Sequence, residues 1–289
     1  MRIVLFGGAG FLGRHVAAAL TGHDVVAPAR SAVDLTAGPE AIAGLLRGAD
    51  AIVNCAGVTT GPAAGLAAGN VVAVAHLLTA WERAEPGARL VHLGSAAEYG
   101  AAAPGRPVAE TDEPEPVSAY GHSKLAGTAL VAAAHRRGLP ATVLRVFNPL
   151  GPGTPAALLP GRLVAGLRAA ADGGPPATTG PLDGHRDFVD ARDVAAAVRT
   201  AATARAPLPA LLNVGSGRAT ALRDLAGLAA ALAEQPPPAE LGGGSARSAA
   251  VTWQQADLAR VTAALGWRPR VPLAQSLRDM GLGVRAAVP

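Results

Sequence analysis

Short apolar runs alternate along the chain with longer segments whose apolar positions recur at helical spacing. Five apolar runs predict strands, at Ile3–Phe6, Asp24–Ala27, Ala51–Asn54, Leu90–Leu93 and Ala141–Phe147. The alanine-rich segments between them predict helices at Phe11–Leu20, Glu40–Leu46, Val71–Ala84 and Ser118–Arg137. This alternation indicates an α/β fold with a parallel sheet covered by helices on both faces. The nearly continuous apolar character of the strands fits burial on both sides.

The pattern changes after Pro149, where glycine and proline interrupt it at residues 151–155 and 173–176. Beyond these breaks we expect a helix at Asp190–Ala204, with Asp190 as its N-cap, and a strand at Leu211–Val214. Residues 235–244, rich in proline and glycine, predict a linker. Two helices are expected in the tail, at 257–265 and 272–280.

Composition excludes several classes of protein. No apolar run reaches the length of roughly 18 residues that a membrane span needs, so no membrane partner is expected. The net charge of +4 comes without any run of five like charges, and nucleic-acid binding needs clustered cations, so we expect no nucleic-acid partner. The first residues lead directly into a glycine turn and lack a signal-peptide layout, which favours a cytoplasmic location.

Metal binding is not expected either. Cys55 is the only cysteine, which excludes a disulfide framework and a cysteine metal site. The seven histidines show no metal-ligand spacing. His92, on an apolar strand, is expected to be a buried histidine whose hydrogen bonds are satisfied.

A glycine-rich turn follows the first predicted strand and opens the first helix. Residues 7–13 read Gly-Gly-Ala-Gly-Phe-Leu-Gly and satisfy both Gly-x-Gly-x-x-Gly and Gly-x-x-Gly-x-x-Gly. In this context the glycines allow a tight turn and a close approach of the backbone to a pyrophosphate, which the helix N-terminus stabilises. The sequence therefore predicts a Rossmann-type, doubly wound parallel sheet that binds a dinucleotide through Gly7, Gly10, Phe11, Leu12 and Gly13.

The position of this turn at the start of the chain indicates how the domains are arranged. Residues 1–150 are expected to form the NAD(P)-binding domain, to which the strand and helix around 182–216 return. Residues 151–181 and 217–289 are expected to form a smaller C-terminal substrate-binding lobe.

The end of the second predicted strand bears on the choice of cofactor. NAD sites often have an acidic residue there, bonded to the ribose 2′-hydroxyl, but residues 27–31 include none. Arg30 and Ser31 instead suit a 2′-phosphate, to which a guanidinium makes charge-assisted hydrogen bonds. This favours NADP(H) over NAD(H), with NAD(H) kept as the alternative. The position of Asp34 favours a contact with the adenine.

Lys124 is the only lysine in the chain, and Tyr120, one of two tyrosines, lies four residues before it. Residues at this spacing share a helix face. In a sequence that otherwise uses arginine for positive charge, a single lysine indicates a task that a guanidinium cannot perform. The ammonium can lower the pKa of the Tyr120 phenol and make it a usable proton donor or acceptor.

Taken together, the glycine turn, Ser95 and the Tyr-Gly-His-Ser-Lys segment at 120–124 resemble the extended short-chain dehydrogenase/reductase family, which includes sugar-nucleotide epimerases, dehydratases and reductases. The likeness covers nearly the whole chain. Further segments similar to family motifs are Asp34-Leu35, residues 54–57 (Asn-Cys-Ala-Gly), 93–100 (Leu-Gly-Ser-Ala-Ala-Glu-Tyr-Gly), 145–152 (Arg-Val-Phe-Asn-Pro-Leu-Gly-Pro), 184–189 (Gly-His-Arg-Asp-Phe-Val) and 265–269 (Leu-Gly-Trp-Arg-Pro).

The resemblance implies roles for these residues. Tyr120 would donate or accept the hydroxyl proton, Lys124 would lower the Tyr120 pKa and bond the nicotinamide ribose, and Ser95 would hold the reacting oxygen. Asn148 and Arg186 would bind the substrate diphosphate, and Thr59 is a further candidate for substrate contact. Additional cofactor contacts are implied for Asp34, Leu35, Ala56, Gly57 and Phe147.

Two alanines narrow the expected reaction. The 4,6-dehydratases of this family carry acidic residues directly after the Ser or Thr, where this chain has Ala96 and Ala97. An alanine cannot exchange a proton, so a 4,6-dehydratase is disfavoured. Glu98 comes one position later, and on a strand-like segment its side chain would face the other way, which indicates a structural role. The Ser-x-x-Glu-Tyr-Gly pattern resembles GDP-6-deoxy-4-keto-hexose reductases.

These features favour an NAD(P)H-dependent reductase of a nucleotide-activated 4-keto-6-deoxy sugar, with hydride transfer to C4 and Tyr120 as proton donor. An NDP-sugar 4-epimerase with tightly bound NAD uses the same three catalytic residues and stays open. A non-catalytic NADP-binding regulator is a third hypothesis, which intact Ser95, Tyr120 and Lys124 disfavour. The small residues of Ser118–Arg137 would allow a helix-mediated homodimer, as the family resemblance implies.

Overall fold

The computed structural model describes residues 1–242 and 251–283. At its centre lies a parallel sheet of six strands, which confirms the predicted fold class. Its strands are β1 (Arg2–Phe6), β2 (Asp24–Val26), β3 (Ala51–Asn54), β4 (Arg89–Ser95), β5 (Ala141–Val146) and β10 (Leu211–Val214). All of them had been expected within three residues at either end.

The strand order is β2-β1-β3-β4-β5-β10, so the chain reverses direction across the sheet between β1 and β3. The register pairs Phe6 with Asn54 and Ser95 with Val146, which brings the carboxyl ends of neighbouring strands to one edge. Ligands of open α/β sheets bind at this edge, in the crevice at the reversal point.

Two apolar cores cover the two faces of the sheet. One contains Ile3, Leu5, Val91 and Leu144 and is covered by α1 (Phe11–Ala19), α7 (Ala191–Thr203) and α10 (Ala259–Leu265). The other contains Val4, Ile52, Leu90 and Val143 and is covered by α2 (Glu40–Leu46), α4 (Ala73–Ala84) and α5 (Ala119–Arg136). Residues one apart along a strand face opposite cores, as the pleat requires.

The helix expected from Val71 begins earlier. A short α3 (Ala63–Ala67) continues into a π-helical turn, η1 (Ala68–Val72), and then into α4. Together Ala63–Ala84 is long and apolar enough to cross a membrane by length and composition alone. Leu66, Val74 and Leu77 on this helix are buried in the protein, as in a core helix that covers a sheet.

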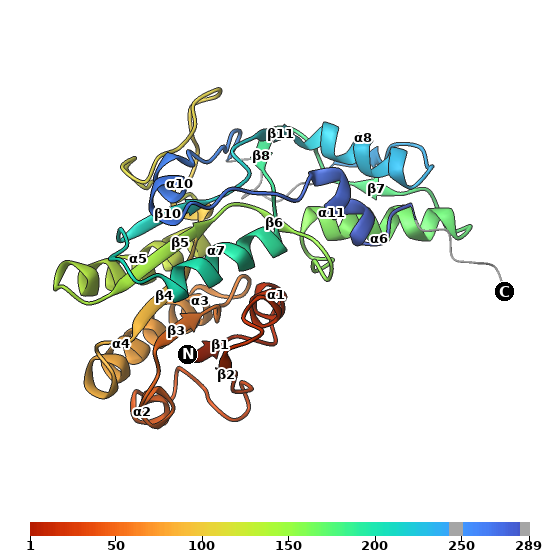
Figure 1. The fold of residues 1–289 in the computed structure, drawn as a ribbon. Coiled ribbons are helices and arrows are strands. Elements are labelled where there is room, and N and C mark those ends of the chain that lie inside the picture. The colour runs from red at the N-terminus through yellow and green to blue at the C-terminus, as the bar shows by residue number, and fades with distance from the viewer. Residues whose placement is uncertain (243–250, 284–289) are drawn as a thin grey trace.

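A third apolar core lies apart from the sheet. It is built around α6 (Leu159–Ala171), α8 (Leu222–Leu232) and α11 (Leu273–Asp279), which lie together at one end of the molecule in Figure 1. The sequence patterns did not predict α6, which glycine and proline residues flank at 151–155 and 173–176, nor α8, which lies further along the chain. They did find α11 and α10, although α10 packs against the sheet core and not against the third core.

Three two-stranded sheets join the outer segments. They pair β8 (His185–Asp187) with β11 (Ala219–Ala221), β7 (Thr178–Thr179) with β12 (Ala239–Glu240), and β6 (Pro149–Leu150) with β9 (Val189–Asp190). The expected linker at 235–244 is therefore wrong at β12, and its last two residues lie outside the described residues. The N-cap of α7 is confirmed, because the Asp190 carboxylate accepts a hydrogen bond from Arg192 N at 2.7 Å.

Candidate active site

The predicted cofactor and catalytic residues gather at the carboxyl edge of the sheet. The glycine turn follows β1, the segment from Cys55 to Thr59 follows β3, and Ser95 ends β4. Asn148 is the second residue after β5 and directly follows Phe147. Tyr120 and Lys124 lie on α5, which packs over β4 and β5. The topology therefore explains how motifs that are far apart in sequence can contribute to one site.

The glycine turn has no room for side chains at its two tightest points. A Cβ on Gly7, whose φ is +75°, would lie 2.5 Å from Ala56 N, so the turn touches the segment after β3. A Cβ on Gly13 would lie 2.0 Å from the Gly7 carbonyl oxygen. No side chain caps the N-terminus of α1 at Gly10, so its first amides stay available to an anion. This geometry fits a dinucleotide pyrophosphate.

The loop after β2 exposes the two residues predicted to select the cofactor. Arg30 and Ser31 are both exposed, as a 2′-phosphate site requires. The Asp34 carboxylate accepts hydrogen bonds from Thr36 N at 2.9 Å and Thr36 Oγ1 at 2.8 Å. These bonds, more than the charge of Arg30, hold the Asp34 pKa below its ordinary value. Leu35 is buried, so its side chain supports this loop from the core.

Asn70 fixes the loop after β3, and sequence reasoning missed it. This residue lies in the π-helical turn and is 1% exposed. Its amide accepts from Val58 N at 2.8 Å and donates to Val58 O at 2.7 Å and to Ser123 Oγ at 2.9 Å. It therefore ties the segment that contains Gly57 and Thr59, both exposed, to the helix that carries Tyr120. The π turn that holds Asn70 is seen only in the structure, and π turns are common at functional positions.

The first turn of α5 lies against the end of β4. Ser118 caps the helix, and its hydroxyl accepts from Gly121 N at 3.1 Å. A Cβ on Gly121 would lie 2.4 Å from the Ala97 carbonyl oxygen, so glycine allows Tyr120 to approach the turn that follows Ser95. The hydroxyl of Ser95 accepts a hydrogen bond from Ala97 N at 3.2 Å.

Lys124 is buried behind this contact. It is 6% exposed, and its ammonium donates to the Leu93 carbonyl at 2.5 Å. Burial lowers the pKa of Lys124, and the negative charge of Glu98 opposes that effect. The single lysine of the chain therefore lies in a buried site, where burial and a nearby carboxylate act on its pKa in opposite directions.

Asn148 follows β5 and Arg186 lies on β8, and Asn148 is joined to the turn after Ser95 through Gln254. The Asn148 amide donates to Asp187 O at 3.0 Å and to Gln254 Oε1 at 3.2 Å. Gln254 in turn donates to Ala96 O at 3.2 Å and is 5% exposed. Sequence reasoning missed Gln254, which no motif marks. Arg186 lies on β8 and is largely buried.

The segment that carries Gln254 is held by a buried carboxylate. Asp187 accepts hydrogen bonds from Ser216 N at 2.6 Å, Gly217 N at 2.9 Å and Ala256 N at 3.0 Å. Val108 N donates to the neighbouring Gln255 carbonyl at 2.7 Å. Residues 254–256 are thereby fixed beside the end of β4.

Phe147 does not face a free surface. It is 0% exposed and packs against Tyr99, with ring centroids 6.1 Å apart. A cofactor cannot touch a side chain that exposes no surface, so Phe147 supports the site from behind. The predicted contact roles of the other residues stay predictions.

Two further expectations need correction. Glu98 is buried and structural, as expected, but the reason differs: Ala96–Glu98 is a 3-10 turn, η2, and the carboxylate turns back to accept from Ser95 N. His92 Nδ1 bonds Asn54 Nδ2 at 3.1 Å, but Nε2 has no hydrogen-bond partner among the described residues. The expectation of a fully satisfied histidine was therefore wrong.

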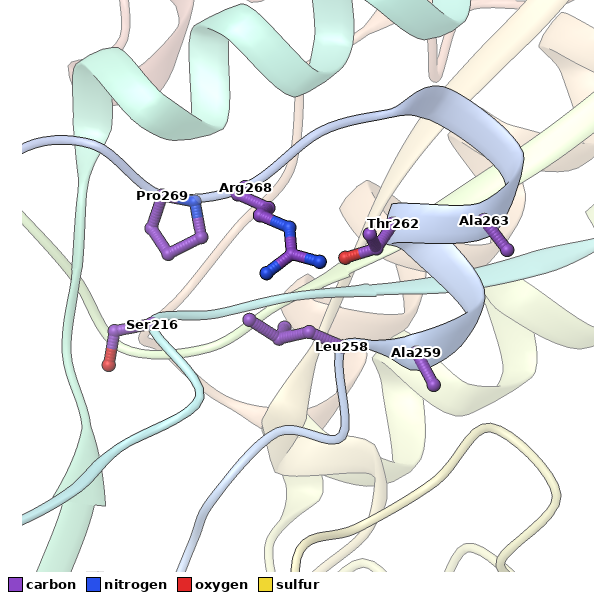
Figure 2. Close-up of a pocket in the computed structure, with 7 residues that line it drawn as sticks. All are labelled: Ser216, Leu258, Ala259, Thr262, Ala263, Arg268 and Pro269. Carbon is purple, nitrogen blue, oxygen red and sulfur yellow. The ribbon is translucent and has the colours of Figure 1, made fainter.

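A separate cavity of about 570 Å³ lies between the end of β10 and α10. Figure 2 shows the Arg268 guanidinium directed between Pro269 and Thr262. None of the predicted catalytic or binding residues lines this cavity. Within residues 1–242 and 251–283, no group of three or more His, Cys, Asp or Glu side chains is placed to hold a metal ion.

Residues 3–215 match the family model described as "NAD dependent epimerase/dehydratase family". The chain belongs to this family. The match includes the glycine turn, Ser95, Tyr120 and Lys124, and it confirms the family resemblance seen in the sequence motifs.

Relatives within the family act on sugar nucleotides, by their names. The chain is 35% identical, over 96% of its length and 94% of the relative's, to a dTDP-6-deoxy-L-talose 4-dehydrogenase (NAD(P)(+)) of Kitasatospora kifunensis. It is 28% identical, over 96% and 95%, to a GDP-6-deoxy-D-mannose reductase of Pseudomonas aeruginosa. Its fold is similar to that of RMD from Pseudomonas aeruginosa complexed with NADPH, with a TM-score of 0.85, 26% identity, and coverage of 96% and 97%.

Proposed function

We propose that this protein is an NAD(P)H-dependent reductase that converts a dTDP-linked 4-keto-6-deoxyhexose to the 4-hydroxy sugar, with NADPH preferred. The observation that carries the proposal is the end of β4. Ser95, Tyr120 and Lys124 are all present there, while Ala96 and Ala97 remove the acid–base groups that an elimination would need. The talose 4-dehydrogenase that the chain resembles over 96% of its length supports a dTDP sugar and reaction at C4.

The chain's own residues supply the proton and hold the ketone. NADPH, when bound, supplies the hydride that adds to C4. In our proposal Ser95 donates a hydrogen bond to the C4 oxygen, and Tyr120 gives that oxygen its proton as the hydroxyl forms. Lys124 stabilises the resulting tyrosinate through its positive charge, which acts strongly because the site is buried. Asn148 and Arg186 would bind the diphosphate and Thr59 the sugar.

The cofactor preference rests on the loop after β2. Arg30 and Ser31 are exposed, and residues 27–31 include no acidic side chain that would repel a 2′-phosphate. We propose that Arg30 binds this phosphate. Because one similar structure holds NADPH and another, MoeE5 at 28% identity and a TM-score of 0.82, holds NAD, both cofactors belong in the test.

The test follows absorbance at 340 nm with NADPH and, separately, NADH, on a 4-keto-6-deoxyhexose carried on dTDP, GDP or UDP. We expect NADPH oxidation with the dTDP sugar. The chain has only two tyrosines, so Tyr120→Phe has a matched control in Tyr99→Phe, whose hydroxyl bonds Asn213 in the core at 2.8 Å. Y120F should lose turnover by at least about a hundredfold, the contribution of a general acid, whereas Y99F should retain it.

Failure of every substrate to oxidise NADPH or NADH would contradict the reductase proposal. The second candidate is then a 4-epimerase, which the 32% identity to a dTDP-L-rhamnose 4-epimerase of Burkholderia thailandensis, over 60% of the chain, supports. An epimerase regenerates its cofactor in each turnover. Tightly held NAD in the purified protein, with interconversion of C4 epimers and no net change at 340 nm, would identify it. Binding of NADPH without either activity would point to a regulator.

The proposal includes a homodimer in the cytoplasm. The helix Ala63–Ala84 is apolar, yet only 39% of its most apolar window is buried within one chain. On α5, which packs against α4, the small residues Ala126 and Ala133 are partly exposed and Ala129 is exposed. Two copies that pack these helices together would cover this surface. A mass near 57 kDa by light scattering, twice the 28.6 kDa chain, would support the dimer, and 28.6 kDa would exclude it.

A further inference from the structure

A buried carboxylate lies at the end of β4, directly behind Ser95. Glu98 is 0% exposed. Its Oε1 accepts hydrogen bonds from Ser95 N at 2.7 Å and from Thr128 Oγ1 at 3.0 Å. Its Oε2 accepts from Arg145 Nε at 2.8 Å, and the Arg145 side chain is itself 3% exposed. Every group around this carboxylate donates, so its negative charge is held in place by the fold.

The backbone is shaped to admit this carboxylate. A Cβ on Gly94 would lie 2.8 Å from Glu98 Oε1 and 3.2 Å from Arg145 Cγ, closer than side chains tolerate. Glycine at 94 therefore leaves the space that the carboxylate occupies. Ser95 returns a bond to the same turn, since its hydroxyl accepts from Ala97 N. Ser95 and Glu98 thus form a reciprocal capping pair that fixes the direction of the strand end.

Glu98 is also close to Lys124. Thr128, which donates to Glu98 Oε1, lies one helical turn after Lys124 on the same face of α5. The ammonium donates to Leu93 O, and the carboxylate accepts from Ser95 N, two residues along the same strand end. The ammonium and the carboxylate, both buried, therefore contact the end of β4 beside the same face of α5.

Among the influences that raise the pKa of Lys124, the negative charge of Glu98 is the largest. Burial raises the pKa of the Cys55 thiol, after β3, to about 12, so it stays neutral. Burial holds the pKa of His92, on β4, well below its ordinary value, so the imidazole is neutral too. Tyr120 precedes Lys124 on α5, and Arg145, on β5, is bound to the far oxygen of the carboxylate. Burial lowers the Lys124 pKa, and Glu98 is the larger of the two influences that raise it.

We propose that Glu98 is a positioning residue that keeps the Lys124 ammonium charged inside the protein while it fixes the Ser95 end of β4. One carboxylate thereby serves two of the three catalytic residues. Its effect on catalysis rests on the proposed reductase function, but its effect on Lys124 does not. A buried arginine stays charged without a partner, whereas a buried lysine can lose its proton. A buried acidic neighbour is therefore needed because residue 124 is a lysine.

The single lysine allows a direct measurement without substrate. Protein labelled with ¹³C at the lysine Cε, and carrying a lysine-free tag, gives one resonance, whose chemical shift titrates with the Lys124 ammonium. In Glu98→Gln we expect the midpoint to fall by about one pH unit, the size expected for loss of a nearby opposite charge. Thr128→Val is the matched control: it removes one hydrogen bond from the same carboxylate but keeps the charge, and its midpoint should stay at the wild-type value.

The same variants test catalysis separately. The alkaline limb of kcat/KM should move to lower pH in E98Q, in step with the resonance, and should stay in place in T128V. If E98Q leaves Arg145 unpaired and does not fold, the double variant E98Q/R145Q leaves neither charge alone, and its midpoint is compared with that of R145Q, so that the two proteins differ only in the Glu98 charge. A Lys124 midpoint equal to that of wild type in the folded variant would overturn the proposal. Absence of turnover in wild type, with the midpoint shifted as expected, would count against the reductase function only.

Discussion

The close packing of the glycine turn predicts that a single added methyl group, in Gly13→Ala, will destabilise the protein, whereas the same change at Gly44 will not. Gly13 and Gly44 are both glycines inside helices, α1 and α2, with ordinary backbone angles. A Cβ at Gly44 would meet no atom within 4 Å. A Cβ at Gly13 would lie 2.0 Å from the Gly7 carbonyl oxygen, 1.4 Å short of the 3.4 Å at which ordinary contact begins, and 2.8 Å from Gly8 Cα. Both neighbours are backbone atoms, so no side chain can rotate away.

The two substitutions to alanine should therefore have opposite signs. Replacing glycine by alanine in a helix stabilises it by about 0.5–1 kcal/mol, which is the expected gain for G44A. At Gly13 the same gain is outweighed by overpacking, which costs about 1–3 kcal/mol, because the turn and the helix must separate by more than an ångström. We expect G13A to lower the free energy of unfolding by about 1–2 kcal/mol. The displaced amides should also bind a pyrophosphate worse.

The assay combines urea unfolding with NADPH titration by calorimetry. A hydrogen bond to a charged group contributes about 1.5–3 kcal/mol, so loss of one such bond predicts at least tenfold weaker NADPH binding in G13A. G44A should bind like wild type. The reasoning would be refuted if G13A were as stable as G44A and kept wild-type affinity, because the turn would then have the room that the structure denies it.

Three further predictions concern single side chains. Arg30→Ala should weaken NADPH binding about tenfold and leave NADH binding within about twofold, since only NADPH carries the 2′-phosphate. The control is Arg205→Ala, which removes another exposed arginine. Equal losses for both cofactors in R30A, or a similar loss of NADPH binding in R205A, would contradict the proposed role of Arg30. The Cys55 thiol, whose pKa burial raises to about 12, should not react with Ellman's reagent at pH 8 until the protein is unfolded in guanidinium, when one thiol per chain should appear. Burial lowers the pKa of His92, so as the pH falls the unfolded chain takes up a proton at this residue before the folded protein does. The free energy of unfolding should therefore fall by up to about 1.4 kcal/mol per pH unit below pH 6.5 on account of this group. The slope of the free energy of unfolding against pH, measured between pH 6.5 and 5.5, should be smaller in His92→Phe, and an unchanged slope would show that His92 contributes none of it.

Elements with a clear period in the sequence could be predicted well. The strands Ala51–Asn54 and Leu211–Val214 and the helix Glu40–Leu46 agree with the structure at both ends. Their apolar residues enter the sheet cores, so burial and pattern coincide. Helices α6 and α8 escaped because their apolar faces pack on each other in the third core, away from the sheet, and glycine and proline residues surround them. Their own residues, mostly leucine, alanine and arginine, favour helix, so the neighbouring glycine and proline residues hid a helical propensity that was present.

Within the site, too, residues that a sequence motif marks could be predicted, and residues that only distant contacts bring in could not. Ser95, Tyr120 and Lys124 could be found because parallel strands deliver their carboxyl ends to one edge, and motifs mark those ends. Asn70 and Gln254 could not be found, because their partners are distant in sequence: Ser123 is 53 residues from Asn70, and Ala96 is 158 residues from Gln254. The direction of Glu98 was predicted from strand alternation, although a 3-10 turn produces it. A correct position can therefore follow from an incorrect local conformation.

The hydrogen bond from Ala256 N to the Asp187 carboxylate affects the order in which parts of the site can form while the chain is being synthesised. The ribosome releases the sheet strands, the glycine turn and α5 long before residues 251–257. Until that segment emerges and Asp187 captures it, Gln254 cannot reach Ala96 or Asn148. A nascent chain that already has a folded nucleotide-binding sheet therefore still lacks one wall beside Ser95. A chain that ends between residues 215 and 253 would keep every strand of the sheet and the glycine turn but would lack Gln254, so we expect it to retain cofactor binding better than the proposed activity.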